Sequence, residues 1–250
     1  MTGFDHMRAS AFLAMAFALL GACTAMQSAE PPMSAEQARA VVENPIRTDR
    51  DRQMDASRKP VEFLAFAQVR PGMRVLDISA GAGYTTQIMA LAVGPGGKVW
   101  AQSPNPGQAL AKRLADHPQA NVVVSKRPFD DPVPEDAAGL DVVTLVNNYH
   151  DISYLPVDRA EMNRKLFAAL KPGGRYIVMD HAAAAGSGIS AGKTLHRIDE
   201  AIVRDEVRQA GFVLDGEATF LRNPSDARDK PSTASEQTSD KFLLRFVKPR

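Results

Sequence analysis

Cysteine is almost absent from this chain of 250 residues, in which Cys23 stands alone. A single cysteine excludes a disulfide within the chain, but it does not argue against export. An excess of one charge is also lacking, because 30 lysine and arginine residues face 29 acidic residues, for a net charge of +1. A chain so near neutrality has no global field that would recruit nucleic acid or an anionic membrane. We find no internal repeat, and the length and composition predict one sizeable globular domain with a tail.

Long hydrophobic runs are missing too, since the most apolar stretch, residues 9–22, is too short to span a bilayer comfortably. Such a run is typical of a signal-peptide core. The segment that ends it, Leu20-Gly-Ala-Cys23, resembles a bacterial lipobox. We therefore predict a signal peptide over residues 1–23 and a periplasmic lipoprotein that meets the membrane only through an anchor at Cys23. A non-lipidated signal peptide cut at another position is the alternative.

The next segment, residues 24–45, is predicted to be a tether followed by a short helix. Its first part is small, polar and contains proline, as flexible linkers do. Ser34-Ala-Glu-Gln37 has the form of a capping box and marks the start of the helix.

The most informative stretch runs from Arg74 to Thr86 and combines a β-rich run, a glycine turn and the start of a helix. This unit offers backbone N–H groups and a helix N-terminus to a nucleotide-like ligand. Gly81 and Gly83 let the backbone approach such a ligand, because no Cβ stands in the way. The pattern Val-Leu-Asp-x-x-x-Gly-x-Gly, with Asp77 at the strand end, resembles the first motif of class I S-adenosylmethionine-dependent methyltransferases.

Further motifs extend this resemblance over roughly residues 60–250. Leu170-Lys-Pro-Gly-Gly174 is a frequent feature of these enzymes before their fifth strand. Together with Asn-Tyr-His-Asp, Met-Asp-His and Leu-His-Arg-Ile-Asp, it is similar to a group of predicted exported bacterial methyltransferases of unassigned substrate. The resemblance implies an α/β fold over residues 46–250: a Rossmann-like, doubly wound, mostly parallel seven-stranded sheet with an antiparallel last strand. We expect its later helices at residues 109–117, 156–170 and 195–210, the last with Thr194 as its cap.

The resemblance also implies S-adenosylmethionine as the cofactor. The residues we predict to bind it are Asp77, Ser79, Gly81, Gly83, Tyr84, Ser103, Phe129 and Asn147. The family usually ends its second strand with an acid that binds both ribose hydroxyls, and this chain has Ser103 at that place. Gln102, Ser103 or Asn105 could bond a ribose, although without charge assistance.

Residues 47–60 carry a dense mixture of both charges. Such runs usually form a solvated surface segment. The alternative is that Asp55, Arg58 and Lys59 fold over the mouth of the cofactor site, as the segment before the first strand often does in this fold.

The methyl acceptor is predicted to meet residues at the ends of the fourth and fifth strands. Residues 141–146 read as a strand buried on both faces, and they run into Asn147-Asn-Tyr-His-Asp151. Side chains at the carboxyl ends of parallel strands face the ligand crevice of an open sheet. The candidate catalytic residues are Tyr149, His150, Asp151, Asp180 and His181.

An oxygen or nitrogen acceptor needs a base to remove its proton. His150 is the predicted base, with Asp151 or Asp180 orienting it. A structural hydrogen bond at the strand end is the alternative role for His150.

The residues His150, Asp151, Asp180 and His181 also occupy the places at which catechol-type O-methyltransferases hold a divalent cation, and His196 could approach them. Two histidines with carboxylates would suit Zn, Fe or Mn better than Mg. The departure from the family's acid-only pattern favours a metal-free site.

We predict methyl transfer from S-adenosylmethionine to an oxygen or nitrogen of an unidentified small molecule, without nucleic acid. The rival is a non-catalytic periplasmic ligand-binding module on a methyltransferase scaffold, because S-adenosylmethionine is made in the cytoplasm. The missing ribose acid favours that rival, and the polar cluster at the strand ends favours the enzyme.

Overall fold

The computed structural model of the protein describes residues 1–2, 31–234 and 238–250. The predicted signal-peptide core, the lipobox and most of the tether lie outside the described residues and stay predictions. Residues 31–250 form one compact unit. No helix among the described residues is long and apolar enough to cross a membrane.

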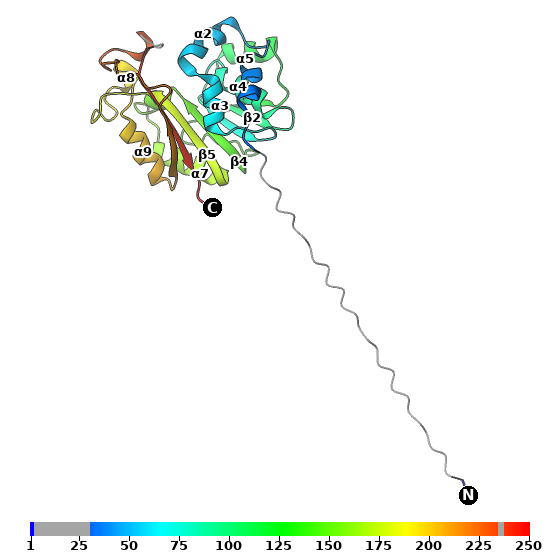
Figure 1. Ribbon diagram of the computed structural model, residues 1–250. Helices are drawn as coiled ribbons and strands as arrows, with labels where there is room; N and C mark the ends of the chain where they lie inside the picture. The colour runs from blue at the N-terminus through cyan, green and yellow to red at the C-terminus, as the bar shows by residue number, and fades with distance from the viewer. Residues whose placement is uncertain (3–30, 235–237) are drawn as a thin grey trace. The chain divides into compact units, whose positions relative to one another are not determined.

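A seven-stranded sheet with the order β3-β2-β1-β4-β5-β7-β6 forms the centre of this unit (Figure 1). The first five strands are parallel, whereas β7 lies antiparallel between β5 and β6. The predicted fold class is therefore confirmed. The strands are β1 Arg74–Ile78, β2 Lys98–Ser103, β3 Val122–Lys126, β4 Leu140–Val146, β5 Leu170–His181, β6 Val213–Ala218 and β7 Lys241–Val247.

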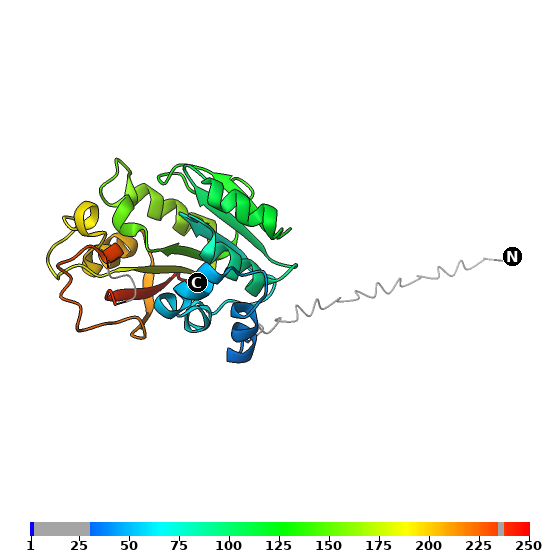
Figure 2. The same cartoon turned by 90° about the horizontal axis from the view of Figure 1, so that it is seen from above.

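Helices cover both faces of the sheet (Figure 2). Successive residues of a strand point to opposite faces, so in β1 Val75 packs with α1, α3 and α4, whereas Leu76 packs with α7 and α9. The helices are α1 Ala35–Val42, α2 Asp49–Arg58, α3 Pro60–Ala67, α4 Tyr84–Val93, α5 Gln108–Asp116, α6 Tyr149–Ile152, α7 Arg159–Ala169, α8 Gly192–Leu195 and α9 Glu200–Gln209, with a 3₁₀ turn η1 at Ser232–Ala234.

The predicted helix over residues 195–210 is wrong, because two helices, α8 and α9, occupy this region. Between them His196 has a left-handed backbone (φ 49°), and Ile198 forms an isolated parallel bridge with Ala182. Asp199, rather than Thr194, caps α9 by accepting a hydrogen bond from the amide of Ala201 at 3.0 Å. The predicted helix over residues 156–170 is correct in place, but it begins only at Arg159.

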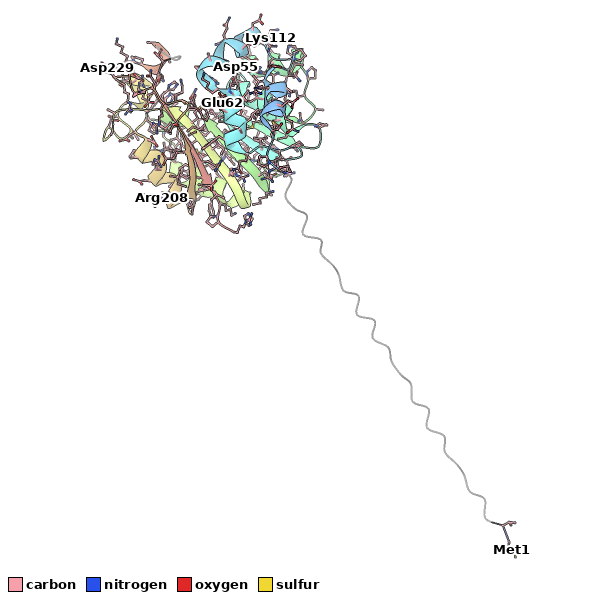
Figure 3. All side chains as sticks on the ribbon, viewed as in Figure 1. Met1, Asp55, Glu62, Lys112, Arg208 and Asp229 are labelled. Carbon is pink, nitrogen blue, oxygen red and sulfur yellow. The ribbon has the colours of Figure 1, made fainter. Side chains whose placement is uncertain are left out.

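The carboxyl ends of the parallel strands form one edge of the sheet, where ligands of open α/β folds bind. In Figure 1, α2 and α8 lie at this upper edge and the carboxyl terminus lies at the opposite one. Figure 3 shows Asp55 of α2 at the same edge and Arg208, near the end of α9, well away from it. Segments distant in sequence therefore meet where the β1–α4 turn and the residues after β4 and β5 converge.

Candidate functional site

A cleft lies beside the glycine turn between β1 and α4. It is lined by Arg50, Met54, Arg58, Asp77, Ser79, Ala80, Gly81, Ala82, Tyr84, Thr85, Arg113, Val146, Asn147 and Asn148. A Cβ added to Gly81 would have only the Ser79 carbonyl oxygen near it, at 3.8 Å, so the backbone there faces open space. At Gly83 a Cβ would come within 2.8 Å of Leu110 and 3.0 Å of Arg113. Gly83 therefore allows α5 to pack against the turn, which is a different role from the predicted ligand contact.

Two non-glycine residues in this cleft have left-handed backbones, Ser79 (φ 56°) and Asn147 (φ 53°). Such conformations cost energy and cluster at functional sites. The buried Oδ1 of Asn147 also has no hydrogen-bond partner among the described residues. An orphaned acceptor that lines a cleft is suited to a ligand N–H donor.

Asp77 is buried beneath the cleft, and its two carboxylate oxygens accept hydrogen bonds from Thr86 at 2.6 Å and Thr144 at 2.7 Å. Burial raises the pKa of Asp77 to about 6, although both hydroxyl hydrogen bonds act in the opposite direction. Asp77 therefore connects β1, α4 and β4 below the site, and it also contributes to the cleft lining.

A hydrogen bond, an ion pair and a cation–π contact hold helix α2 at the cleft. Tyr84 donates a hydrogen bond to Asp55 at 2.6 Å, and Arg47 pairs with the same carboxylate at 2.5 Å. The guanidinium of Arg58 lies 4.7 Å from the centre of the Tyr84 ring. The charged segment thus lies at the cleft instead of forming only a solvated surface.

A second anchor joins the start of α2 to α5. The Asp51 carboxylate is bonded by both terminal nitrogens of Arg113 at 2.8 Å. Although burial favours the neutral acid, hydrogen bonds from Arg113 and Thr48 hold the pKa of Asp51 at about 2. This pair was not predicted, because nothing in the local sequence pattern links residues 62 positions apart.

A second hollow shares Ser79 and Asn148 with the first cleft. Its lining comprises Ser79, Ser103, Pro104, Asn105, Pro128, Phe129, Asp130, Asn148, Asp151, Tyr154, Leu155, Pro156 and Val157. Ser103 and Phe129, which were predicted to meet a ribose and an adenine, both line this hollow, and those roles stay predictions. Gln102 is not available to a ribose, since its buried amide accepts from the amide of Ser79 at 3.1 Å and donates to the Arg127 carbonyl at 2.6 Å.

His150 lies between two carboxylates where α6 begins. Its Nδ1 is 2.6 Å from Oδ1 of the fully buried Asp180, and its Nε2 is 3.3 Å from Oδ1 of Asp151. Asp180 also accepts hydrogen bonds from the amides of His150 at 2.8 Å and His181 at 2.7 Å.

Burial disfavours a charged imidazole, but Asp180 and Asp151 outweigh it and raise the pKa of His150 to about 10. An imidazolium has no free lone pair. The raised pKa argues against His150 as a proton acceptor at neutral pH, and its role as the base stays a prediction.

Two other predicted catalytic residues do not face the crevice. Tyr149 is fully buried in the core below the sheet, where its hydroxyl lies 2.7 Å from Glu206 and 2.9 Å from Asn163. Its side chain therefore lies in the core and not at the crevice, because consecutive residues of α6 point in different directions. His181 is buried with its Nδ1 2.8 Å from the Ser239 hydroxyl, and burial lowers its pKa to about 2. The structure thus brings together His150, Asp151 and Asp180. The ring of His181 lies 6.1 Å from that of His150 but pairs with Ser239, and Tyr149 lies in the core.

We expect His150 to titrate near pH 10 in protein dialysed against a chelator. Because its folded pKa is above the unfolded value of about 6.5, its stabilising contribution is fully present below pH 6.5. That contribution is lost as the pH rises through about 10. Histidine ring proton shifts followed by NMR from pH 5 to 11 would measure this, with His150→Gln to assign the signal. A midpoint near 6.5 would contradict the two-carboxylate environment.

Comparisons with known proteins agree with this architecture. A family model described as protein-L-isoaspartate(D-aspartate) O-methyltransferase matches residues 29–126. The ubiquinone/menaquinone biosynthesis C-methyltransferase UbiE of Burkholderia multivorans is 37% identical over 123 residues, which are 47% of this chain and 46% of that protein. The chain spans about half the length of the curated relatives it matches.

Solved structures show the same fold. A SAM-dependent methyltransferase from Aquifex aeolicus has a TM-score of 0.58 at 16% identity, with 86% of this chain and 98% of that chain covered. A TehB-like SAM-dependent methyltransferase from Corynebacterium glutamicum has a TM-score of 0.51 at 16% identity, with 79% and 94% covered. The fold is that of the class I methyltransferases.

Proposed function

We propose that this chain, a class I S-adenosylmethionine-dependent methyltransferase by its fold and by partial sequence similarity, methylates an oxygen or nitrogen atom of a small molecule. The main observation behind the proposal is the open space in front of Gly81. This space belongs to a cleft that shares two lining residues, Ser79 and Asn148, with the second hollow. A cofactor with an amino-acid end and a nucleoside end needs two such adjoining sites.

The residues present fit the two ends of the cofactor. Arg50 and Arg58 line the first cleft and supply positive charge for the methionine carboxylate. The orphaned Oδ1 of Asn147 is suited to the methionine ammonium group. Ser103 and Phe129 line the second hollow, where we assign the Ser103 hydroxyl to the ribose and the Phe129 ring to the adenine. The end of β2 carries Ser103 instead of an acid, so we expect weaker ribose binding than an acid at that position would give.

S-adenosylmethionine supplies an electrophilic methyl group with a good leaving group. The protein's main contribution is therefore to hold the acceptor in line with that methyl group and to exclude water. Asp151, Asn148 and Tyr154 line the hollow at the acceptor side, and the carboxylate of Asp151 lies 2.9 Å from the Tyr154 hydroxyl and 3.0 Å from the Asn148 amide. These polar groups orient a hydroxyl or amine. The carbon acceptors named for the UbiE relatives are the second outcome for an acceptor screen.

We expect saturable binding of S-adenosylmethionine in isothermal titration calorimetry at concentrations below about 1 mM, a range typical of enzymes and their substrates. S-adenosylhomocysteine should compete, since it presents the same two ends. Transfer of labelled methyl groups to a panel of hydroxyl, amine and carbon acceptors then identifies the product.

The same measurements separate the enzyme from its rivals. An absence of heat at millimolar cofactor would overturn the proposal. Tight binding without transfer to any acceptor class would favour a ligand-binding module.

A further inference from the structure

Three donor groups from two separate segments converge beside the second hollow. They are Nε2 of His150, Oδ1 of Asp151 and Nδ1 of His196, and all lie within 4.8 Å of one another. Asp151 is 3.3 Å from the nitrogen of His150 and 3.2 Å from that of His196. We propose that these three side chains bind one divalent transition metal, with Zn²⁺ as the first candidate, and that the metal holds an acceptor oxygen.

The spacing of the donors fits a tetrahedral site. Ligands that lie about 2.0–2.1 Å from a tetrahedral Zn²⁺ are roughly 3.3–3.4 Å from each other. The distances from Asp151 to His150 and His196, 3.3 and 3.2 Å, are close to this value, so little movement is needed there. Three protein ligands leave the fourth position open, as in catalytic zinc sites.

Asp180 supports the site from behind. It holds Nδ1 of His150 at 2.6 Å, which leaves Nε2 of the same ring directed toward Asp151. A carboxylate behind a histidine is the usual arrangement for a metal-binding imidazole, because it fixes the ring and raises its basicity. The two carboxylates with neutral histidines carry a charge of −2, which a divalent ion would balance.

Two of the four predicted metal ligands, Asp180 and His181, are not part of the proposed site. Both oxygens of Asp180 already accept hydrogen bonds from protein groups, and His181 is turned toward Ser239. His196 takes their place. Its left-handed backbone (φ 49°) and the hydrogen bond from Ser232 to its carbonyl, at 2.9 Å, fix it between α8 and α9. Such strain at a non-glycine residue is commonly kept for function.

The site deepens the proposed function and depends on it for its role in transfer. Asp151 lines the second hollow, so the open position would face the acceptor. A bound cation lowers the pKa of a coordinated hydroxyl. The acceptor O–H would lose its proton to water, the resulting oxyanion would form an O–C bond with the methyl group, and the C–S bond would break to leave a neutral thioether. The acceptor class is thus an alcohol, phenol or enol, and no histidine base is needed at neutral pH.

The test is metal binding by the protein without a histidine tag, stripped with chelator and then titrated with Zn²⁺. We expect about one Zn²⁺ per chain by elemental analysis after desalting. Cobalt(II) should give the intense visible bands of a tetrahedral site. His196→Ala, at a ring that is 37% exposed, should fold normally and weaken binding by at least about 100-fold. His117→Ala, at the end of α5, is the matched control and should bind as the wild type does.

The zinc titrations can support or overturn the metal site. Substoichiometric zinc in the wild type, or equal affinity in His196→Ala and wild type, would overturn it in favour of a metal-free imidazolium held by Asp151 and Asp180. Asp151→Asn provides a second variant in case the first unfolds, and unchanged zinc affinity in a folded Asp151→Asn protein would likewise overturn the site. Metal binding is measured without S-adenosylmethionine, so failure of the cofactor to bind would reject the proposed function while leaving the metal site intact.

Discussion

Replacement of Gly81 by valine is expected to lower the affinity for S-adenosylmethionine by at least about 100-fold, the equivalent of about 3 kcal/mol of overpacking in the site. The backbone of Gly81 borders open space in the cleft, and its nearest neighbour to an added Cβ is 3.8 Å away. The two methyl groups of valine would occupy the space that the proposal assigns to the methionine end of the cofactor. Because little protein surrounds this position, the fold itself should tolerate the change.

The positive φ of Gly81 (56°) adds a backbone cost of roughly 1–2 kcal/mol for a residue with a side chain. Gly139→Val is a matched control, because Gly139 has a φ of 67°, no atom within 4 Å of an added Cβ, and no part in either hollow. Both variants should lose similar stability in thermal unfolding, and only Gly81→Val should lose the calorimetric signal. Normal binding by Gly81→Val would place the cofactor elsewhere.

The strands of the sheet could be predicted from the sequence because each one shows a pattern of apolar residues within its own few positions. β4 reads as a buried strand from its run of apolar residues alone, and the residue pattern of β1 distinguishes the strand from the turn that follows. The glycine turn was located for the same reason, since its backbone conformation depends on Gly81 and Gly83 themselves. The number of strands and the antiparallel direction of the last one came instead from the resemblance to a known fold.

The side chains at the site could not be placed in this way, because their partners come from distant segments. Tyr149 follows a strand end and carries a polar hydroxyl, as a crevice residue would. In the structure, however, this hydroxyl forms hydrogen bonds with Asn163 and Glu206 in the core. The pKa of His150 depends on Asp180, which is 30 residues away in sequence. No pattern around His150 distinguishes a base from an imidazolium held by two carboxylates.

Arg197 is a buried charged residue whose partners also come from distant segments. It is fully buried, with its guanidinium 2.8 Å from Asp226 and 3.0 Å from the Ala182 carbonyl. It follows His196 directly in the segment between α8 and α9, and its pair with Asp226 ties that segment to the chain before β7. A single sequence shows only an arginine after a histidine, so neither the burial nor the partner could be predicted.

Loss of the Asp180 carboxylate is expected to destabilise the protein by about 3–5 kcal/mol, as removal of one partner of a buried pair does. In Asp180→Ala the amides of His150 and His181 and the Nδ1 of His150 would lose the acceptor that all three now share, at 2.6–2.8 Å. At neutral pH the His150 cation would keep only Asp151. For a chain of this size the loss corresponds to a fall in Tm of roughly 6–20 °C.

Asp205→Ala is the control for removal of an acid, since Asp205 is exposed on α9 and the change should shift stability by at most about 0.5 kcal/mol. Asp180→Asn distinguishes hydrogen bonding from charge, because an asparagine oxygen can still accept from one amide while its NH₂ group faces the remaining donors. It should therefore recover only part of the loss at pH 7. Urea unfolding of the chelator-treated proteins would measure all three variants. Asp180→Ala as stable as Asp205→Ala would mean that water or a shift of α6 satisfies the orphaned donors, and that Asp180 does not hold His150 in place.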